Sequence, residues 1–103
     1  MHIVRVMAGD VFKALADSTR RCILDELVER DGQTLFELCT RLVSKHGLDL
    51  SRQGVSQHLA VLEDAELVRT RRSGRYKFHD LNTEPLEPLA TRWLRPETPG
   101  GAS

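Results

Sequence analysis

One segment of the 103-residue chain, Ser51 to His79, holds the side chains best suited to chemistry with nucleic acid. A helix is expected to begin at Ser51, with Val55, Leu59 and Leu62 turned inward at helical spacing. The opposite face is polar, and its candidate DNA-binding residues are Ser51, Arg52, Gln53, Ser56 and Gln57. In a DNA groove, Gln can bond adenine at two points, Arg can bond guanine, and Ser can bond several bases. These residue types favour groove readout; the alternative is an ordinary polar helix surface.

Five cations crowd the nine residues from Arg69 to Lys77, with no acidic residue among them. Cations this close repel one another unless phosphate neutralises them, and phosphate contacts hold a protein on DNA without reading its sequence. The candidate phosphate-binding residues are Arg69, Arg71, Arg72, Arg75 and Lys77. Tyr76 and Phe78 are expected to anchor this segment to the core rather than to stack on bases.

The basic residues are concentrated in one part of the chain. In total there are 15 Lys or Arg and 15 Asp or Glu, so the net charge is zero. Residues 41–79 hold eight basic and four acidic groups, residues 1–40 hold five and seven, and residues 80–103 hold two and four. Such a chain is not expected to coat nucleic acid indiscriminately, but to dock through one basic face.

Four helices are expected up to the basic segment, because apolar residues recur there at helical spacing. The apolar residues at helical spacing in the first three are Val11, Phe12, Leu15, Ile23, Leu24, Leu27, Val28, Leu35, Leu38, Leu42 and Val43. Polar N-cap residues are expected at Asp17, Thr34 and Ser51. Glu37 occupies the capping-box position after Thr34. Stop signals follow at Asp31-Gly32 and His46-Gly47.

The pattern then changes from helix to strand. Residues 68–79 alternate in character around Ser73-Gly74, which predicts a β-hairpin with a two-residue turn. A last helix is expected from about Glu84-Pro85, with an apolar face of Leu86, Leu89, Ala90, Trp93 and Leu94. The predicted fold class is mainly α with a small β-hairpin: a winged helix-turn-helix of about five helices and a two-stranded wing. One domain is expected over residues 1–95 and a disordered tail over residues 96–103.

Length and composition exclude several classes of protein. No apolar run approaches the roughly 20 residues of a membrane helix, and the first residues lack the pattern of a signal peptide, so no membrane partner is expected. Two cysteines, Cys22 and Cys39, are too few for a disulfide framework and favour a cytoplasmic location. An enzyme is not expected, since the chain lacks a phosphate-cradling Gly-rich loop, a zinc-hydrolase helix motif and a supported Ser/His/Asp arrangement.

The motifs over residues 11–81 resemble those of the ArsR/SmtB family of bacterial winged-helix repressors. In order they read FKALADSTRRCILDEL, TLFELC, SRQGVSQHLAVLEDAELV and RTRRSGRYKFHDL, and the match over SQHLAVLEDAELVRTRRSGRYKF is the specific one. The resemblance implies a homodimer joined mainly by the first and last helices, so that residues 1–95 serve both DNA binding and dimerisation. The implied dimer-interface residues are Val11, Phe12, Leu15, Leu86, Leu89 and Trp93. Two recognition helices about 34 Å apart would then require an inverted-repeat operator.

Three positions bear on backbone geometry. Many family members have Gly just after the recognition helix, where this chain has Glu66, and a left-handed non-Gly residue there would cost about 1 kcal/mol. The linker KHGLDLS ahead of the recognition helix is longer than in many relatives. Gly54 costs about 1 kcal/mol relative to Ala inside a helix, which indicates a close approach of the backbone to another group.

The family's metal sensors often carry a Cys-x-Cys pair in the third helix. Cys39 keeps the first thiol, but Arg41 stands where the second belongs and would oppose a cation. The other common site uses Asp and His on the last helix, yet residues 82–103 contain no His. The remaining donors are His2, Cys22, Cys39, His46, His58 and His79, of which His58 is expected to lie between helices as a neutral hydrogen-bonding group. No cofactor is required, the metal ligands are unknown, and a regulatory nickel or zinc ion stays an open alternative.

The predicted function is a sequence-specific regulator of transcription that binds double-stranded DNA as a homodimer, by family default as a repressor. The alternative is a winged-helix module whose basic face grips another protein without reading DNA sequence. Salt-sensitive discrimination between operator and random duplex would favour DNA binding. Affinity for a protein partner that survives Arg71→Ala and Arg75→Ala would favour the interaction module.

Overall fold

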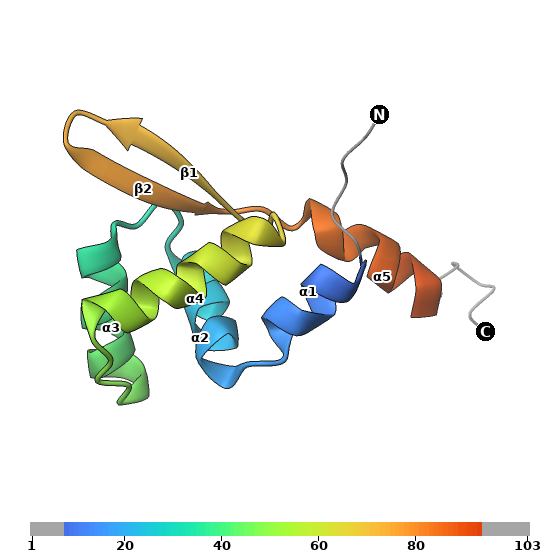
Figure 1. Cartoon of the computed structure of the whole chain (residues 1–103), viewed down its shortest axis with the longest axis horizontal. Coiled ribbons are helices and arrows are strands. Elements are labelled where there is room, and N and C mark those ends of the chain that lie inside the picture. The colour runs from blue at the N-terminus through green and yellow to red at the C-terminus, as the bar shows by residue number, and fades with distance from the viewer. Residues whose placement is uncertain (1–7, 94–103) are drawn as a thin grey trace, which may run out of the picture.

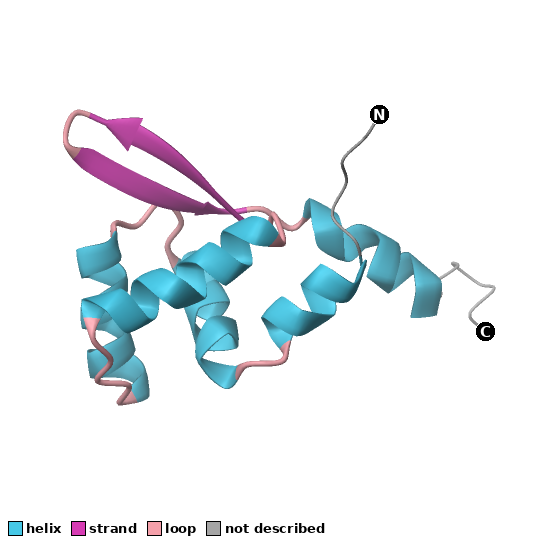
Figure 2. Cartoon of the chain, in the orientation of Figure 1, coloured by secondary structure: helices cyan, strands magenta, loops and turns pink. Residues whose placement is uncertain are grey.

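The structure, a computed structural model, describes residues 8–93; the predicted tail and the domain boundary at residue 95 lie outside this range. The described residues form five α-helices, one 3-10 turn and a two-stranded antiparallel hairpin, which confirms the predicted fold class (Figures 1 and 2). The elements are α1 (Ala8–Leu15), α2 (Ser18–Glu29), α3 (Leu35–His46), α4 (Arg52–Asp64), β1 (Val68–Ser73), β2 (Tyr76–Leu81), η1 (Glu84–Leu86) and α5 (Glu87–Trp93). Within this range no helix has both the length and the apolar character needed to span a bilayer.

Local capping sets the limits of the helices as predicted. The Asp17 side chain accepts a hydrogen bond from Arg20 N at 3.1 Å where α2 begins. At the start of α3, Glu37 N donates to Thr34 Oγ1 at 3.2 Å and Thr34 N donates to Glu37 Oε1 at 2.9 Å. At the end of α3, Gly47 has a φ of 67°, a left-handed conformation that a residue without Cβ adopts freely.

The hydrophobic core lies where α1 to α4 meet the base of the hairpin. Its buried apolar residues are Val11, Ala14, Ile23, Leu27, Leu38, Leu42, Val55, Leu59, Leu62, Ala65, Leu67 and Val68. Three of the apolar residues at helical spacing are exposed: Phe12 at 45%, Val28 at 71% and Val43 at 47%. Each follows a buried apolar residue, and one residue along a helix turns the side chain by about 100°, which carries all three out of the core.

The chain turns from α4 into the hairpin at Glu66. Its φ of 59° makes Glu66 the one non-glycine residue in the left-handed region among residues 8–93, and this confirms the conformation anticipated for it. Asn82 follows β2 directly and forms two hydrogen bonds with the turn between α4 and β1. Its Nδ2 donates to Glu66 O at 2.7 Å, and its N donates to Leu67 O at 2.9 Å. Both ends of the hairpin are therefore held at one point beside the core.

The hairpin, hereafter the wing (residues 68–81), has a turn one residue later than predicted. Ser73 pairs with Tyr76, so the turn consists of Gly74 and Arg75, and Gly74 has the positive φ of 63°. Arg75 therefore lies at the tip of the wing and not in a strand. At the base, His79 N donates to Gln33 O at 2.8 Å and Gln33 N donates to His79 O at 3.1 Å. These two bonds join β2 to Gln33, which precedes the N-cap of α3.

Candidate nucleic-acid interface

α4 presents the polar face that the sequence predicts. Its exposed side chains include Arg52, Gln53, Ser56 and Gln57. On the other side of the helix, Val55, Leu59 and Leu62 are at most 2% exposed. Since the apolar side is held in the core, α4 cannot turn about its axis, and the four polar side chains face solvent in a defined direction.

The first turn of α4 is closed by its own N-cap. Ser51 Oγ accepts a hydrogen bond from Gly54 N at 3.0 Å. A Cβ added at Gly54 would lie 3.2 Å from that same Ser51 Oγ, tighter than an ordinary contact. The close approach predicted at Gly54 is therefore made to the cap of the same helix. Ser51, a predicted DNA-binding residue, is exposed but already uses its hydroxyl as a local acceptor.

The five cations of the wing divide into two groups. Arg71 Nε donates to Asp80 Oδ2 at 2.8 Å, and its guanidinium lies 4.9 Å from the centre of the Phe78 ring. Arg69 Nη2 lies 3.4 Å from Glu84 Oε1. The remaining three, which form no ion pair within the part of the chain that the structure describes, are Arg72, Arg75 and Lys77. The sequence did not predict these two ion pairs, because Asp80 and Glu84 both come after the basic segment in the chain.

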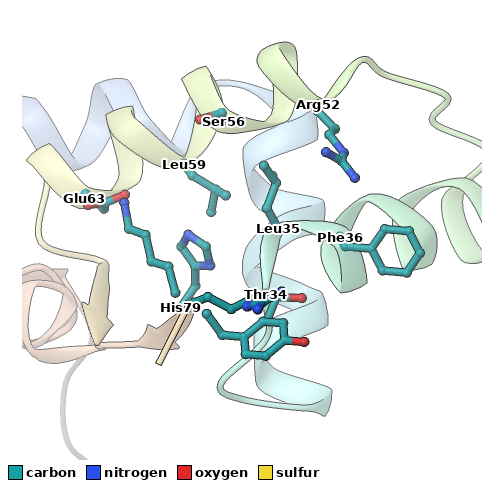
Figure 3. Close-up of a pocket in the computed structure, with 11 residues that line it drawn as sticks. Thr34, Leu35, Phe36, Arg52, Ser56, Leu59, Glu63 and His79 are labelled. Carbon is teal, nitrogen blue, oxygen red and sulfur yellow. The ribbon is translucent and has the colours of Figure 1, made fainter. Parts of the chain in front are cut away.

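A cleft of about 390 Å³ lies between α4 and the wing, and Figure 3 shows Leu59 pointing into it from α4, with Thr34 and His79 on the opposite side. Four of the predicted DNA-binding residues line this cleft: Arg52, Ser56, Arg75 and Lys77. The other predicted residues that do not line it are Ser51, Gln53, Gln57, Arg69, Arg71 and Arg72. The structure thus brings one subset of the candidates together around a single hollow.

Two aromatic residues beside the cleft were not predicted as site residues. Phe36, in the first turn of α3, is 64% exposed, and Tyr76, at the start of β2, is 58% exposed. The prediction that Tyr76 anchors the wing to the core is wrong, because the pairing of Ser73 with Tyr76 places it next to the tip. Phe78 is half-buried and lies 6.2 Å from the Tyr76 ring, centre to centre. The sequence could not predict that Phe36 and Tyr76 lie near each other, because this depends on how α3 and the wing pack.

A cluster of charges joins α2 to α3 away from this cleft. Glu26 is 2% exposed, and its carboxylate accepts hydrogen bonds from Arg41 Nε and His46 Nε2, each at 2.7 Å. Lys45 Nζ lies 3.6 Å from the same carboxylate, and Arg41 and Lys45 also contact Glu29. Burial raises the pKa of Glu26, but the hydrogen bonds from His46 and Arg41 and the charge of Lys45 outweigh it, so the pKa lies below its ordinary value.

Three of the possible metal donors, all histidines, form hydrogen bonds with other residues. His46 binds Glu26, His79 Nδ1 donates to Gln33 O at 2.9 Å, and Arg20 Nη1 donates to His58 Nδ1 at 3.2 Å. Arg41, in the position of the missing second thiol, is the partner of Glu26. Burial raises the pKa of the Cys39 thiol, which disfavours the thiolate that metals bind. Across residues 8–93, no three His, Cys, Asp or Glu side chains meet in a metal-binding group, and His2 lies outside that range.

The predicted dimer-interface residues differ in their exposure. Val11 is 2% exposed and belongs to the core of its own chain, so its side chain is not on the surface as that prediction requires. Phe12, its neighbour on α1, is 45% exposed. Leu15, Leu86 and Leu89 are half-buried against the core. The side chain of Trp93 lies outside the described part of the chain.

Comparison with known proteins places this architecture among regulators of transcription. A helix-turn-helix domain family matches residues 15–71, more than half of the chain. The HTH-type transcriptional regulator YuzN of Bacillus subtilis is 52% identical over 84 residues, which cover 82% of this chain and 91% of YuzN. The transcriptional repressor SdpR of the same bacterium is 35% identical over 79 residues, which cover 77% of this chain and 80% of SdpR.

Solved structures show the same fold. The crystal structure of an ArsR family transcriptional regulator aligns with a TM-score of 0.70 at 27% identity, over 89% of this chain and 88% of that protein. HlyU from Vibrio cholerae aligns with a TM-score of 0.63 at 33% identity, over 85% of this chain and 92% of HlyU. With its solvent-facing polar helix and basic wing, the chain belongs to the ArsR/SmtB family of winged helix-turn-helix transcriptional regulators, which are DNA-binding proteins and not enzymes.

Proposed function

We propose that this protein is a sequence-specific repressor that binds an inverted-repeat operator as a homodimer. The observation that carries the proposal is the fixed polar face of α4, whose Arg52, Gln53, Ser56 and Gln57 all reach solvent. These side chains match the hydrogen-bonding groups of base edges in the major groove. Beside them stand three wing cations without an ion pair among residues 8–93, and a DNA phosphate is the natural counter-charge for them.

The homodimer and the repressor role rest on separate support. α1 and α5 lie at the end of the molecule away from α3, and Phe12 on α1 is 45% exposed there (Figure 1). A partner packed on this end would leave α4 and the wing of both protomers open to DNA, with half-sites about 34 Å apart. Repression follows by analogy with relatives such as SdpR, which is named as a transcriptional repressor. The proposal contains no metal, since residues 8–93 offer no group of ligands for one.

The test is fluorescence anisotropy of the purified protein with the DNA upstream of its own gene and with a scrambled duplex, at about 0.15 M salt. We expect tight binding to the native duplex and binding to the scrambled one that is weaker by a factor of about 10³ or more. Equal, weak binding to both would contradict sequence-specific reading and favour the protein-interaction module.

Two substitutions distinguish base contacts, which give sequence specificity, from phosphate contacts, which give affinity for any duplex. Gln57→Ala should lower affinity for the native duplex by about 5- to 150-fold and leave binding to the scrambled duplex nearly unchanged, because a base contact is removed. Arg75→Ala should weaken binding to both duplexes and reduce the salt dependence, because a phosphate contact is removed. Equal effects of the two substitutions on both duplexes would argue against this division.

A further inference from the structure

The cleft between α4 and the wing has three walls from different parts of the chain. α4 contributes Arg52 and Ser56, the first turn of α3 contributes Phe36, and the wing contributes Tyr76 and Lys77 (Figure 3). Its inner surface is formed by residues that the fold holds in place: Leu59 is 2% exposed and His79 is 4% exposed. A hollow of about 390 Å³ with such walls can take up a compact group without rearrangement of the core.

The charge of the cleft favours an anion. Arg52, Arg75 and Lys77 line it together with one carboxylate, Glu63. These groups leave a local excess of two positive charges. At the start of α3, the capping box satisfies the N–H groups of Thr34 and Glu37. What α3 adds is apolar surface, mainly the Phe36 ring.

Phe36 and Tyr76 form an apolar rim beside these cations. They are 64% and 58% exposed, although exposing aromatic rings to water is unfavourable. Phe36 also borders two other hollows, one with Glu37 and Thr40 and the other with Tyr76 and Phe78, so its ring lies between concave surfaces. A ligand that carries a negative group next to an apolar body would contact the cations and this rim at the same time.

The placement of the cleft identifies that ligand. When α4 lies in the major groove and the wing cations contact phosphate, the sugar-phosphate strand that borders this groove must pass between α4 and the wing. We infer that the cleft seats one phosphodiester of this strand, with Arg52 and Lys77 facing the phosphate and Phe36 and Tyr76 packed against the adjoining deoxyribose. This inference rests on the proposed function. It adds two positioning residues, Phe36 and Tyr76, which contact the DNA backbone through apolar surface and not through charge.

The first test compares Phe36→Ala and Tyr76→Ala with Val43→Ala. Val43 is a matched control, since it lies on α3, is 47% exposed and does not line the cleft. We expect each aromatic variant to weaken binding to native and scrambled duplexes alike, by about 3- to 10-fold, because apolar area is lost at a contact common to all DNA. The slope of affinity against salt should stay unchanged, since no cation is removed. Val43→Ala should bind as the unchanged protein does.

The second test locates the phosphate. Duplexes in which one phosphate at a time is replaced by a neutral methylphosphonate should reveal one position in each half-site at which the unchanged protein loses about tenfold in affinity. The same replacement should have a smaller effect on Arg52→Ala, because the partner of that phosphate is already missing. All these side chains except Lys77 are exposed, so the variants should keep their melting temperature, which is measured in parallel.

The outcomes separate this inference from the proposed function. Tight binding of the native duplex by the unchanged protein, with full affinity in Phe36→Ala and Tyr76→Ala, would overturn the inference and leave the repressor intact. An aromatic variant that reduces the salt slope would also overturn it, because the ring would then act through a displaced cation. Failure of the unchanged protein to bind any duplex would overturn both.

Discussion

Glu66 carries local backbone strain that another residue would relieve. Its φ of 59° places Cβ close to the backbone, which costs a non-glycine residue about 1 kcal/mol. Its side chain is exposed, so little packing is lost on its removal. We expect Glu66→Gly to raise the melting temperature, by about 4 °C or more if the whole strain is relieved. Thermal unfolding followed by circular dichroism measures this change.

Glu66→Ala serves as the control, because alanine keeps the Cβ and with it the strain. It should melt at or below the temperature of the unchanged protein. The hydrogen bond that Asn82 donates to Glu66 O involves the backbone and is kept in both variants, so a glycine variant no more stable than the alanine variant would contradict this strain.

Glu26 is a buried carboxylate whose partners keep it charged. Its hydrogen bonds from Arg41 and His46 are lost or weakened in Glu26→Gln, so this variant should be less stable by about 1–3 kcal/mol near neutral pH. The lower part of this range is favoured if Arg41 and Lys45, whose side chains are 25% and 37% exposed, regain water.

The contribution of Glu26 to the free energy of unfolding should decrease as the pH falls. The pKa of Glu26 is lower in the folded protein than its ordinary value of about 4.3, so folding favours the charged form. The stabilisation is therefore fully present above about pH 4.3 and is lost as the pH falls through the lower, folded-state pKa. Urea unfolding of the two proteins should show a smaller difference in the free energy of unfolding in acid than at neutral pH. A difference that grows in acid would contradict this assignment.

At the scale of the element, the wing is not a uniform row of cations. Arg71 is paired with Asp80 and lies against Phe78, whereas Arg75 stands in the turn without an ion pair among the described residues. We expect Arg75→Ala to reduce the salt dependence of DNA binding by about one phosphate contact, and Arg71→Ala to reduce it by less. Titrations at several salt concentrations measure both slopes.

The ion pair of Arg71 predicts a further difference. Asp80→Asn should raise the affinity for native and scrambled duplexes in the unchanged protein, because Arg71 is then free to contact phosphate, but should have no such effect in Arg71→Ala. Equal salt slopes for Arg71→Ala and Arg75→Ala would show that Asp80 does not hold Arg71 back from DNA.

At the scale of the whole molecule, the proposed dimer requires an apolar surface on α1. Phe12 provides it, with 45% of its surface exposed, whereas its neighbour Val11 is enclosed by its own chain. We expect Phe12→Lys to raise the dissociation constant of the dimer by about tenfold or more and to weaken operator binding in parallel. Sedimentation velocity over a range of protein concentrations measures the first effect.

Val28→Lys is the matched control for this experiment. Val28 lies on α2 and is 71% exposed, so a lysine there should change neither the assembly nor the fold. A Phe12→Lys protein that sediments as the unchanged dimer would show that the dimer forms through another surface.

The sequence by itself determined the helix limits and the polar face of α4. The caps at Asp17, Thr34 and Ser51 join atoms no more than three residues apart, so no tertiary contact is needed to form them. Likewise, the spacing of Val55, Leu59 and Leu62 left a single face of α4 for solvent. The left-handed conformation of Glu66 was anticipated from the resemblance instead, because many family members have Gly at this position.

Only the tertiary structure decided which distant groups meet. Arg41 forms a hydrogen bond with Glu26, 15 residues away in the chain, and His79 forms one with Gln33, 46 residues away. Such pairs depend on how the elements pack and not on local spacing. Packing also exposed Val28 and Val43, which have the same apolar character as their buried neighbours. The cleft beside α4 exists because α3, α4 and the wing converge there, and this convergence is a property of the folded chain alone.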